Sequence, residues 1–553
     1  MISTRMKIQV KIFGKVKWEI SSIKDITVYF RGSFFHKNQF YDAINAVNYL
    51  KNFELNNLEI VKEQIKDFSG FFSIIISNNQ DNILLISDKV ASIPLFYNIS
   101  ESEIVVTDNL NPNYFLNIEI DDTKAIEYLN CLYVLNNDTF IKGFNKTKAG
   151  TITRLSINSI KQFNYFVYYS NIRTDKTENK LIEDFDHILS KVFDRCIRFL
   201  DGRTAVVPLS GGLDSRLVVS MLKKKNYENL ICYAYGSKNS LEVQKSQQIA
   251  DKLGYKWFFI EYNKSNLKSI FKSEEITNYW KYAGNASSIP HPDEFLALYE
   301  INKFNKVPVD TVFLPGHTGD FISGGHLGNV YDQNLNLKND LTTSIIKKHC
   351  SLNTSLLTTA TLDNLKESVN RTLNELNKVD NLEDSQYEYW EWRERQSKYI
   401  INAVRSYEFF HYGWYIPLWD DEIMNYWKEI PLTLKYNKNL YKKFLFKTDK
   451  FHVFQDINSN KVHTKRFKKP QRQLLKELLD KIHVAPSIID WIFNIDRLNI
   501  EYKTHGINFA QTFGYFEYIF SKTNKRNVQY LFAEEYLARI WKVNLVDLIK
   551  KNG

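Results

Sequence analysis

Cysteine is scarce in this sequence. Four cysteines occur among 553 residues, and no two of them have the CxxC spacing of a metal or redox motif: Cys131, Cys196, Cys232 and Cys350. This scarcity argues against a zinc ribbon and against a disulfide framework. It fits a protein of a reducing compartment.

Long apolar runs are also missing. No stretch approaches the length that spans a bilayer, and the first residues, MISTRMKIQVKIFGK, lack the apolar core of a signal peptide. We therefore expect a cytoplasmic protein with no membrane partner. Hydrophobic residues make up 44% of the chain and no low-complexity run interrupts it, so a globular protein of two or more domains is predicted.

Motifs for nucleic-acid recognition are absent, although the net charge is +10. The densest basic run, Lys461 to Lys476, is better interpreted as a solvated face or as a segment near a triphosphate. A nucleic-acid partner is not expected.

The most informative stretch is Thr204 to Lys225. Thr204 to Leu209 has the pattern of a buried parallel strand, and a helical pattern begins near Ser215. The loop between them contains Gly211 and Gly212, which allow a sharp turn and a close approach of backbone N–H groups to a ligand. Because the following helix directs its positive end toward this turn, the pattern predicts a phosphate site.

The Walker motif is excluded, because its longer glycine spacing and its lysine are missing here. The loop instead resembles the pyrophosphate-binding loop of ATP pyrophosphatases, which cleave ATP between its α and β phosphates. The resemblance implies that Asp214 helps to hold Mg²⁺. It also implies that the loop residues hold pyrophosphate: Leu209, Ser210, Gly211, Gly212, Leu213, Asp214 and Ser215.

Strands and helices alternate after this loop, with a strand at Leu230 to Tyr235, a helix at Leu241 to Leu253 and a strand at Trp257 to Glu261. Such alternation predicts an α/β fold with a doubly wound parallel sheet and ligands beyond the carboxyl ends of its strands. Ala234, Tyr235 and Gly236 would then border the nucleotide. The alternative is an ordinary strand end.

A second glycine-rich loop, PGHTGDFISGGH, follows the apolar run Thr311 to Leu314. It resembles the Gly-Glu-Gly-Ser-Asp-Glu loop of asparagine synthetases. That resemblance implies ATP or pyrophosphate binding by Gly316, Thr318 and Gly319 and metal binding by Asp320. Here His317 and Phe321 replace the two glutamates. The two histidines of the loop also allow a zinc site, which would still need a third ligand.

A third resemblance to asparagine synthetases covers Tyr415 to Tyr441, which contains the Pro-Leu-Trp-Asp and Ile-Pro pairs of that family's pattern. It implies a catalytic lysine shortly afterwards, which by register is Lys442, with Lys443 as the alternative. Gly413 stands where relatives carry a glutamate, and Glu408 is the nearest carboxylate that could replace it.

The N-terminal region predicts a hairpin from Phe71 to Ile86, followed by Asp88 and a Pro-Leu-Phe-Tyr closure. This order resembles the class II glutamine amidotransferase domain of asparagine synthetases and implies an α+β Ntn-hydrolase-like sandwich. Relatives use an N-terminal cysteine as nucleophile, and Ile2 stands in its place. We therefore expect no glutaminase activity from this domain.

The predicted organisation has two domains, joined near the polar stretch Ser170 to Lys180. Residues 1–170 form the degenerate amidotransferase-like domain. Residues 171–553 form the ATP-pyrophosphatase domain, with a helical extension over 450–553. We expect four aromatic residues of this extension in its core: Trp491, Phe493, Tyr515 and Trp541.

The resemblance implies an ATP- and Mg²⁺-dependent ligase that adenylates a carboxylate, releases AMP and pyrophosphate, and forms an amide. The acceptor would be aspartate or a sugar uronic acid of a surface polysaccharide. The nitrogen would come from ammonia, which a separate protein could supply, or from an amine. Two alternatives stay open at this point, a tRNA-modifying ATP pyrophosphatase and a degenerate scaffold protein.

Overall fold

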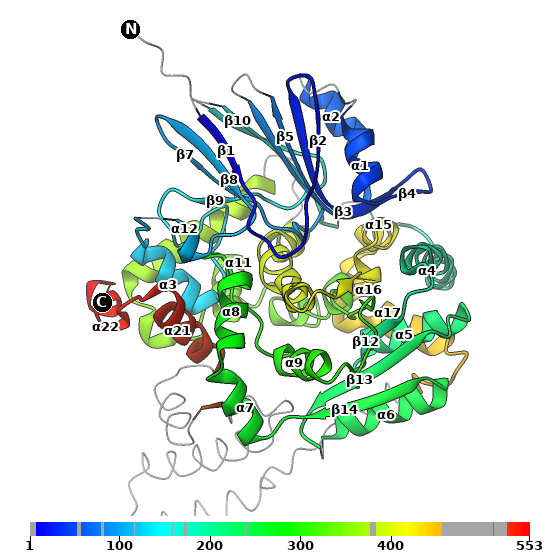
Figure 1. Ribbon diagram of the computed structural model, residues 1–553. Coiled ribbons are helices and arrows are strands. Elements are labelled where there is room, and N and C mark those ends of the chain that lie inside the picture. The colour runs from blue at the N-terminus through cyan, green and yellow to red at the C-terminus, as the bar shows by residue number, and fades with distance from the viewer. Residues whose placement is uncertain are drawn as a thin grey trace, which may run out of the picture.

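The computed structural model describes residues 7–455, 512–513 and 528–552, apart from short gaps at 52, 54–56, 79–81, 116, 157–158, 171–173, 239 and 377–382. Within these residues the strands form three sheets, two near the N-terminus and one in the middle of the chain. Figure 1 shows the N-terminal sheets stacked above a larger body of helices that contains the third sheet.

The N-terminal sheets form a sandwich. One sheet has the order β1 (Lys7–Lys11), β8 (Glu103–Thr107), β7 (Phe96–Ile99) and β9 (Asn145–Lys146). The other has the order β11 (Ser159–Asn164), β10 (Thr151–Ser156), β6 (Ile83–Ser87), β5 (Ser69–Asn78), β3 (Ile26–His36) and β2 (Glu19–Ile23), with β4 (Gln39–Tyr41) beside β3.

The predicted hairpin explains the layers of this sandwich. Its strands β5 and β6 pair antiparallel, as expected. Side chains alternate between the two faces of a strand, so Leu84 and Ile86 pack toward helices α1 (Ala43–Leu50) and α2 (Leu58–Ile65). Ile83 and Leu85 lie in the core that is shared with the other sheet. The order of layers is therefore helices, sheet, sheet.

The third sheet is parallel, as the alternation of elements predicted. Its order is β14 (Lys256–Glu261), β13 (Leu230–Gly236), β12 (Ala205–Pro208), β15 (Val312–Phe313) and β16 (Gly413–Trp414). The chain moves outward from β12 to β14 and then returns to the other side of β12 at β15. In open parallel sheets, ligands bind at such a reversal of strand order.

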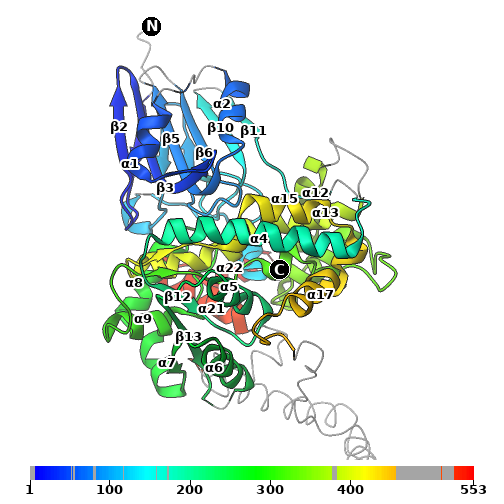
Figure 2. The same ribbon diagram turned by 90° about the vertical axis from the view of Figure 1, so that its right-hand side faces the viewer.

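Helices surround this sheet. Helix α4 (Glu178–Leu200) crosses the molecule beneath the sandwich, while α5 (Leu213–Lys224) and α6 (Leu241–Leu253) pack beside the sheet (Figure 2). Cys196 lies on the buried face of α4, as its spacing predicted. The remaining helices that concern the site are α8 (Glu274–Ala283), α9 (Phe295–Lys303), α10 (Gly319–Ile322), α12 (Thr359–Leu376), α14 (Arg405–Phe409), α15 (Asp421–Glu429) and α17 (Asn439–Lys447).

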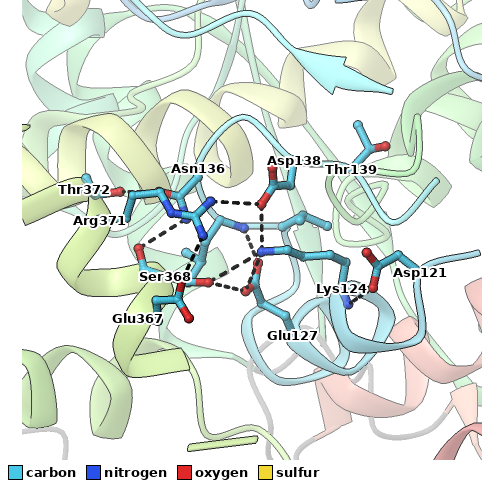
Figure 3. Close-up of polar contacts among 12 residues, drawn as sticks. Asp121, Lys124, Glu127, Asn136, Asp138, Thr139, Glu367, Ser368, Arg371 and Thr372 are labelled. Atoms are coloured by element: carbon cyan, nitrogen blue, oxygen red, sulfur yellow. Dashed lines mark hydrogen bonds and ion pairs between the residues drawn. The ribbon is translucent and has the colours of Figure 1, made fainter. Parts of the chain in front are cut away.

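Helix α3 (Asp122–Cys131) joins the two parts of the chain. Although it lies before residue 170, it packs against α12, α21 (Val528–Trp541) and α22 (Leu545–Asn552). Lys124 is ion-paired with Glu127 at 3.2 Å and with Asp138 at 2.8 Å, and the Ser368 hydroxyl donates to Glu127 at 2.9 Å (Figure 3). The domain boundary at residue 170 stays a prediction, since this helix packs across it.

The C-terminal extension is described only in part. Trp541 is buried in α21, as expected, and both described helices pack on α3. The basic run Lys461 to Lys476 and the predicted core residues Trp491, Phe493 and Tyr515 lie outside the described residues. Within the described residues, no helix is both long and apolar enough to cross a membrane.

Candidate active site

The first glycine loop lies where the sequence predicted it, between β12 and α5. The Ser210 hydroxyl accepts a hydrogen bond from the Gly212 N–H at 3.1 Å, and the Ser210 N–H donates to the Ser215 hydroxyl at 3.1 Å. No side chain caps the start of α5 at Gly212. The first N–H groups of this helix therefore face the loop, and binding of an anion there stays a prediction.

The second glycine loop follows β15, the strand next to β12, and touches the first loop. A Cβ atom on Gly316 would lie 2.4 Å from the Ser215 nitrogen, and one on Gly319 would lie 2.2 Å from Cγ of Asp214. Only glycine allows this approach at both positions. The two loops, 100 residues apart in the sequence, therefore form one surface at the carboxyl ends of β12 and β15.

Lys438 connects the two aspartates of these loops. It immediately precedes α17 with a left-handed backbone, φ 60°, and its ammonium group is ion-paired with the Asp320 carboxylate. It also acts on Asp214. Burial raises the pKa of the Asp214 carboxyl above its usual value, and the charge of Lys438 and a hydrogen bond from Tyr441 at 2.9 Å oppose that rise.

The Lys438 ammonium group is itself perturbed. Burial lowers its pKa, the Asp214 carboxylate opposes this, and the charge of Lys442 lowers it further. Sequence reasoning missed both Lys438 and Tyr441 as site residues. Lys438 lies in the stretch that resembles asparagine synthetases, but its position depends on a backbone conformation that is rare for lysine.

The two lysines that the sequence proposed for catalysis lie on α17 and point to different surroundings. Lys442 lies four residues after Lys438, and its charge acts on the Lys438 ammonium group. Lys443 is exposed and ion-paired with Glu178 of α4 at 2.6 Å. The geometry favours Lys442 over Lys443, and a catalytic role for either stays a prediction.

Ala234, Tyr235 and Gly236 end β13, the other neighbour of β12, so they lie at the same edge of the sheet as the first loop. Tyr235 stacks on Tyr262 with 5.2 Å between ring centroids, and Gly236 has a φ of 127°. Their place agrees with a position beside a nucleotide. Binding of adenine there stays a prediction.

The residues that stand in place of the family glutamates, His317 and Phe321, are uncharged at pH 7. Phe321 is buried against Tyr168 and Trp419, so it contributes to packing. Burial lowers the pKa of His317 to about 4, and its Nδ1 has no hydrogen-bond partner among the described residues. His317 is therefore neutral at pH 7.

Glu408, the nearest carboxylate to the missing glutamate at Gly413, is already engaged. It is ion-paired with Arg31 of the N-terminal sandwich at 2.7 Å and with Arg405 at 2.6 Å. Tyr282 and Trp414 also donate hydrogen bonds to it. Glu408 thus fastens the two parts of the chain together.

The site fits Mg²⁺ as the metal. Asp214 and Asp320 carry carboxylate oxygens, the ligands that Mg²⁺ prefers, and phosphate and water would complete its shell. Their role as metal ligands stays a prediction. Lys438 already brings a positive charge to the same carboxylates. Among the residues described, no group of three or more His, Cys, Asp or Glu side chains forms a metal site, so nothing there supports zinc.

Comparison with known proteins gives one family. The model of the asparagine synthase family matches residues 193–486, more than half of the 553 residues. No curated protein matches the chain. Among solved structures, the NH3-dependent NAD synthetase from Campylobacter jejuni subsp. jejuni NCTC 11168, in complex with the nitrate ion, has 17% sequence identity over 37% of this chain and 97% of that chain. Its TM-score of 0.18 is too low to carry a structural argument.

Proposed function

Because the chain belongs to the asparagine synthase family, we propose that it uses ATP and Mg²⁺ to join a small-molecule carboxylate to ammonia or an amine. The observation that carries this proposal is the meeting of the two glycine loops, where Lys438 is ion-paired with Asp320 and its charge also acts on Asp214. We propose aspartate or a sugar uronic acid as the acceptor.

In the first step, an oxygen of the acceptor carboxylate attacks the α-phosphorus of ATP, and the bond from that phosphorus to the β-phosphate oxygen breaks. Pyrophosphate leaves, and an acyl-adenylate remains. Bound Mg²⁺ would neutralise charge on the phosphates. Backbone N–H groups of the first loop and the start of α5 would hold the leaving pyrophosphate, while the Lys438 and Lys442 ammonium groups would offset its negative charge.

In the second step, a neutral nitrogen attacks the acyl carbon, AMP leaves, and the nitrogen loses a proton. Ammonia from solution, or from a separate protein, would serve. The four cysteines are all buried and unpaired, which agrees with a cytoplasmic protein and with the absence of a cysteine nucleophile for glutamine.

The test is a turnover assay with ATP, Mg²⁺, ammonium chloride and a panel of carboxylic acids that includes aspartate, glucuronate and UDP-glucuronate. We expect AMP and pyrophosphate in equal amounts with at least one acid. Asp214→Asn and Asp320→Asn should each lower pyrophosphate release by roughly 100-fold or more, because each removes a negative charge at the metal.

Asp184→Asn is the matched control, since Asp184 is ion-paired with Lys176 and Lys180 on the outside of α4. It should retain full activity. Pyrophosphate release that is absent with every acid would favour the scaffold alternative. Equal turnover in wild type and in both loop variants would disprove the site.

A further inference from the structure

A π-helix, Glu391–Ile400, lies beside the second glycine loop. His326, which ends that loop, contacts Glu391 through its Nδ1 atom. Gly325, the residue before it, lies so close to Asp320 that a Cβ atom would be 2.9 Å from the Asp320 carbonyl oxygen. The π-helix is therefore connected through His326 to the loop that carries the metal-site carboxylate. Such helices are rare and occur frequently at functional sites.

Arg395 projects from this π-helix with a nearly free guanidinium group. Its described contacts are an ion pair with Glu391, at 3.6 Å between Nη1 and Oε1, and the ring of Tyr399, 5.6 Å from the guanidinium carbon. No hydrogen bond of this guanidinium occurs among the described residues. Its side chain is 24% exposed, so the surrounding residues do not enclose it completely.

Arg393, two residues earlier in the same helix, differs from Arg395 because its guanidinium group is hydrogen-bonded. Its side chain is 2% exposed, and it donates hydrogen bonds to the Ala149 carbonyl and, at 2.7 Å, to the Asn164 side chain. Arg393 therefore has a structural role that its hydrogen bonds account for. Arg395 has no such set of acceptors.

The surroundings of Arg395 leave its positive charge available. His291 lies against Tyr399, with its Nε2 atom 2.7 Å from the Tyr399 carbonyl oxygen and 4.3 Å between the rings. Burial lowers the pKa of His291 to about 4, and the charge of Arg395 adds to that effect, so His291 is neutral at pH 7. The single facing carboxylate in the described contacts of Arg395, Glu391, is shared with His326.

From this geometry we propose that Arg395 binds a second anionic group of the acceptor, beyond the carboxylate that is activated. The proposal rests on the proposed function. A guanidinium group with free donors recognises the paired oxygens of a carboxylate or phosphate through two parallel hydrogen bonds. The acceptor class is therefore acids with two anionic groups, of which one attacks the α-phosphorus of ATP and the other binds Arg395.

The experiment is calorimetric titration of the full chain, saturated with Mg²⁺ and α,β-methylene-ATP, which cannot release pyrophosphate. The probes are matched pairs with two anionic groups or one: succinate against butyrate, aspartate against its α-amide, and glucuronate 1-phosphate against glucuronate. We expect one pair at least to show about 10-fold tighter binding of the two-anion member. The pair that shows this tighter binding identifies the second anionic group as a carboxylate or a phosphate.

Arg395→Gln should remove that preference, lowering affinity for the two-anion probe about 10-fold while changing affinity for its partner less than 3-fold. Arg395→Lys keeps the positive charge without the two parallel donors of a guanidinium group, so it should retain an intermediate preference for the two-anion probe. This variant also tests the proposal if Arg395→Gln does not fold. Arg371→Gln is the control, because Arg371 lies on the outside of α12 and pairs with Glu367.

Wild type that binds both members of every pair equally, or binds no probe, would overturn the proposal, as would an Arg395→Gln variant that keeps the preference. A failure of the nucleotide analogue to bind wild type would instead count against the proposed function. The two failures are therefore distinguishable in one titration.

Discussion

Lys438 is ion-paired with Asp320, although 118 residues separate them in the sequence. Its charge also opposes the rise in the pKa of the Asp214 carboxyl. The positive charge of one lysine thus acts on both carboxylates that we propose as metal ligands. The pairing gives the Asp320 carboxylate a partner before any metal binds, so Lys438 and the metal would compete for its oxygens.

Lys438→Met should therefore tighten Mn²⁺ binding in the absence of nucleotide. Removal of a competing positive charge near two carboxylates should increase the affinity roughly 5-fold, the equivalent of about 1 kcal/mol. Electron paramagnetic resonance of free Mn²⁺ measures this directly. Lys447→Met is the matched control, because Lys447 lies at the far end of α17 and donates to Asn179. Weaker Mn²⁺ binding in Lys438→Met would show that Lys438 supports the metal instead.

Lys442→Ala should lower kcat more than it weakens ATP binding, because its charge would act on the phosphates as negative charge develops in the transition state. Lys443→Ala should stay within about 2-fold of wild type, since an exposed ion pair such as Lys443 with Glu178 contributes little. Steady-state kinetics with varied ATP separates the two effects. An equal loss of kcat in Lys443→Ala alone would move the role to that residue.

The protein should not hydrolyse glutamine. All four cysteines are buried, and burial raises the pKa of the Cys131, Cys196 and Cys232 thiols, so these three resist forming a thiolate. Ammonium chloride should support amide formation, and glutamine should not. An enzymatic glutamate assay checks this. Glutamate formation that survives replacement of all four cysteines would contradict the interpretation of the N-terminal sandwich.

Glu408→Gln should destabilise the chain by about 3–5 kcal/mol, because it removes the carboxylate that is ion-paired with two buried guanidinium groups, those of Arg31 and Arg405. Urea unfolding at pH 7 measures the loss, and Glu178→Gln, at an exposed ion pair, is the control. Burial alone would raise the pKa of Glu408, but the two arginines hold it below its usual value. The difference between variant and wild type should therefore shrink as the pH falls below about 4.5. If Glu408→Gln loses no more unfolding free energy than Glu178→Gln, Glu408 does not hold the two parts of the chain together.

Lys146 gives the chain a pH-dependent stability. It is buried in β9, and burial, with the charges of Lys398 and Arg405, lowers its pKa from 10.5 to about 7. Between these values the unfolded chain binds a proton that the folded chain does not, so stability rises with pH by at most about 1.4 kcal/mol per unit. Lys146→Met should be more stable than wild type at pH 7, and the gain should fade toward pH 10.5. Unfolding curves at several pH values test this, and a gain independent of pH would disprove it.

The sequence by itself determined the elements and loops that depend on local pattern. The strand before Ser210, the glycine turn and the following helix are encoded by neighbouring residues, because hydrophobic period and glycine content act within a few residues. The alternation of strands and helices also predicted the parallel sheet and its binding edge. The close contact between the Asp214 and Asp320 loops follows from the pairing of β12 with β15, which the sequence suggested only through a family resemblance.

The tertiary structure alone decided which charged side chains meet. Lys438 reaches Asp320 through a left-handed residue at the start of α17, and no periodic signal marks such a conformation. Glu408, a candidate for the missing family carboxylate, proved to be held by Arg31, 377 residues earlier in the sequence. Arg393 and Arg395 look alike in the sequence, yet Arg393 donates a hydrogen bond to Asn164, whereas Arg395 is partly exposed. Such pairings depend on how distant segments pack and on the desolvation of each charge, and neither is a property of a short stretch of sequence.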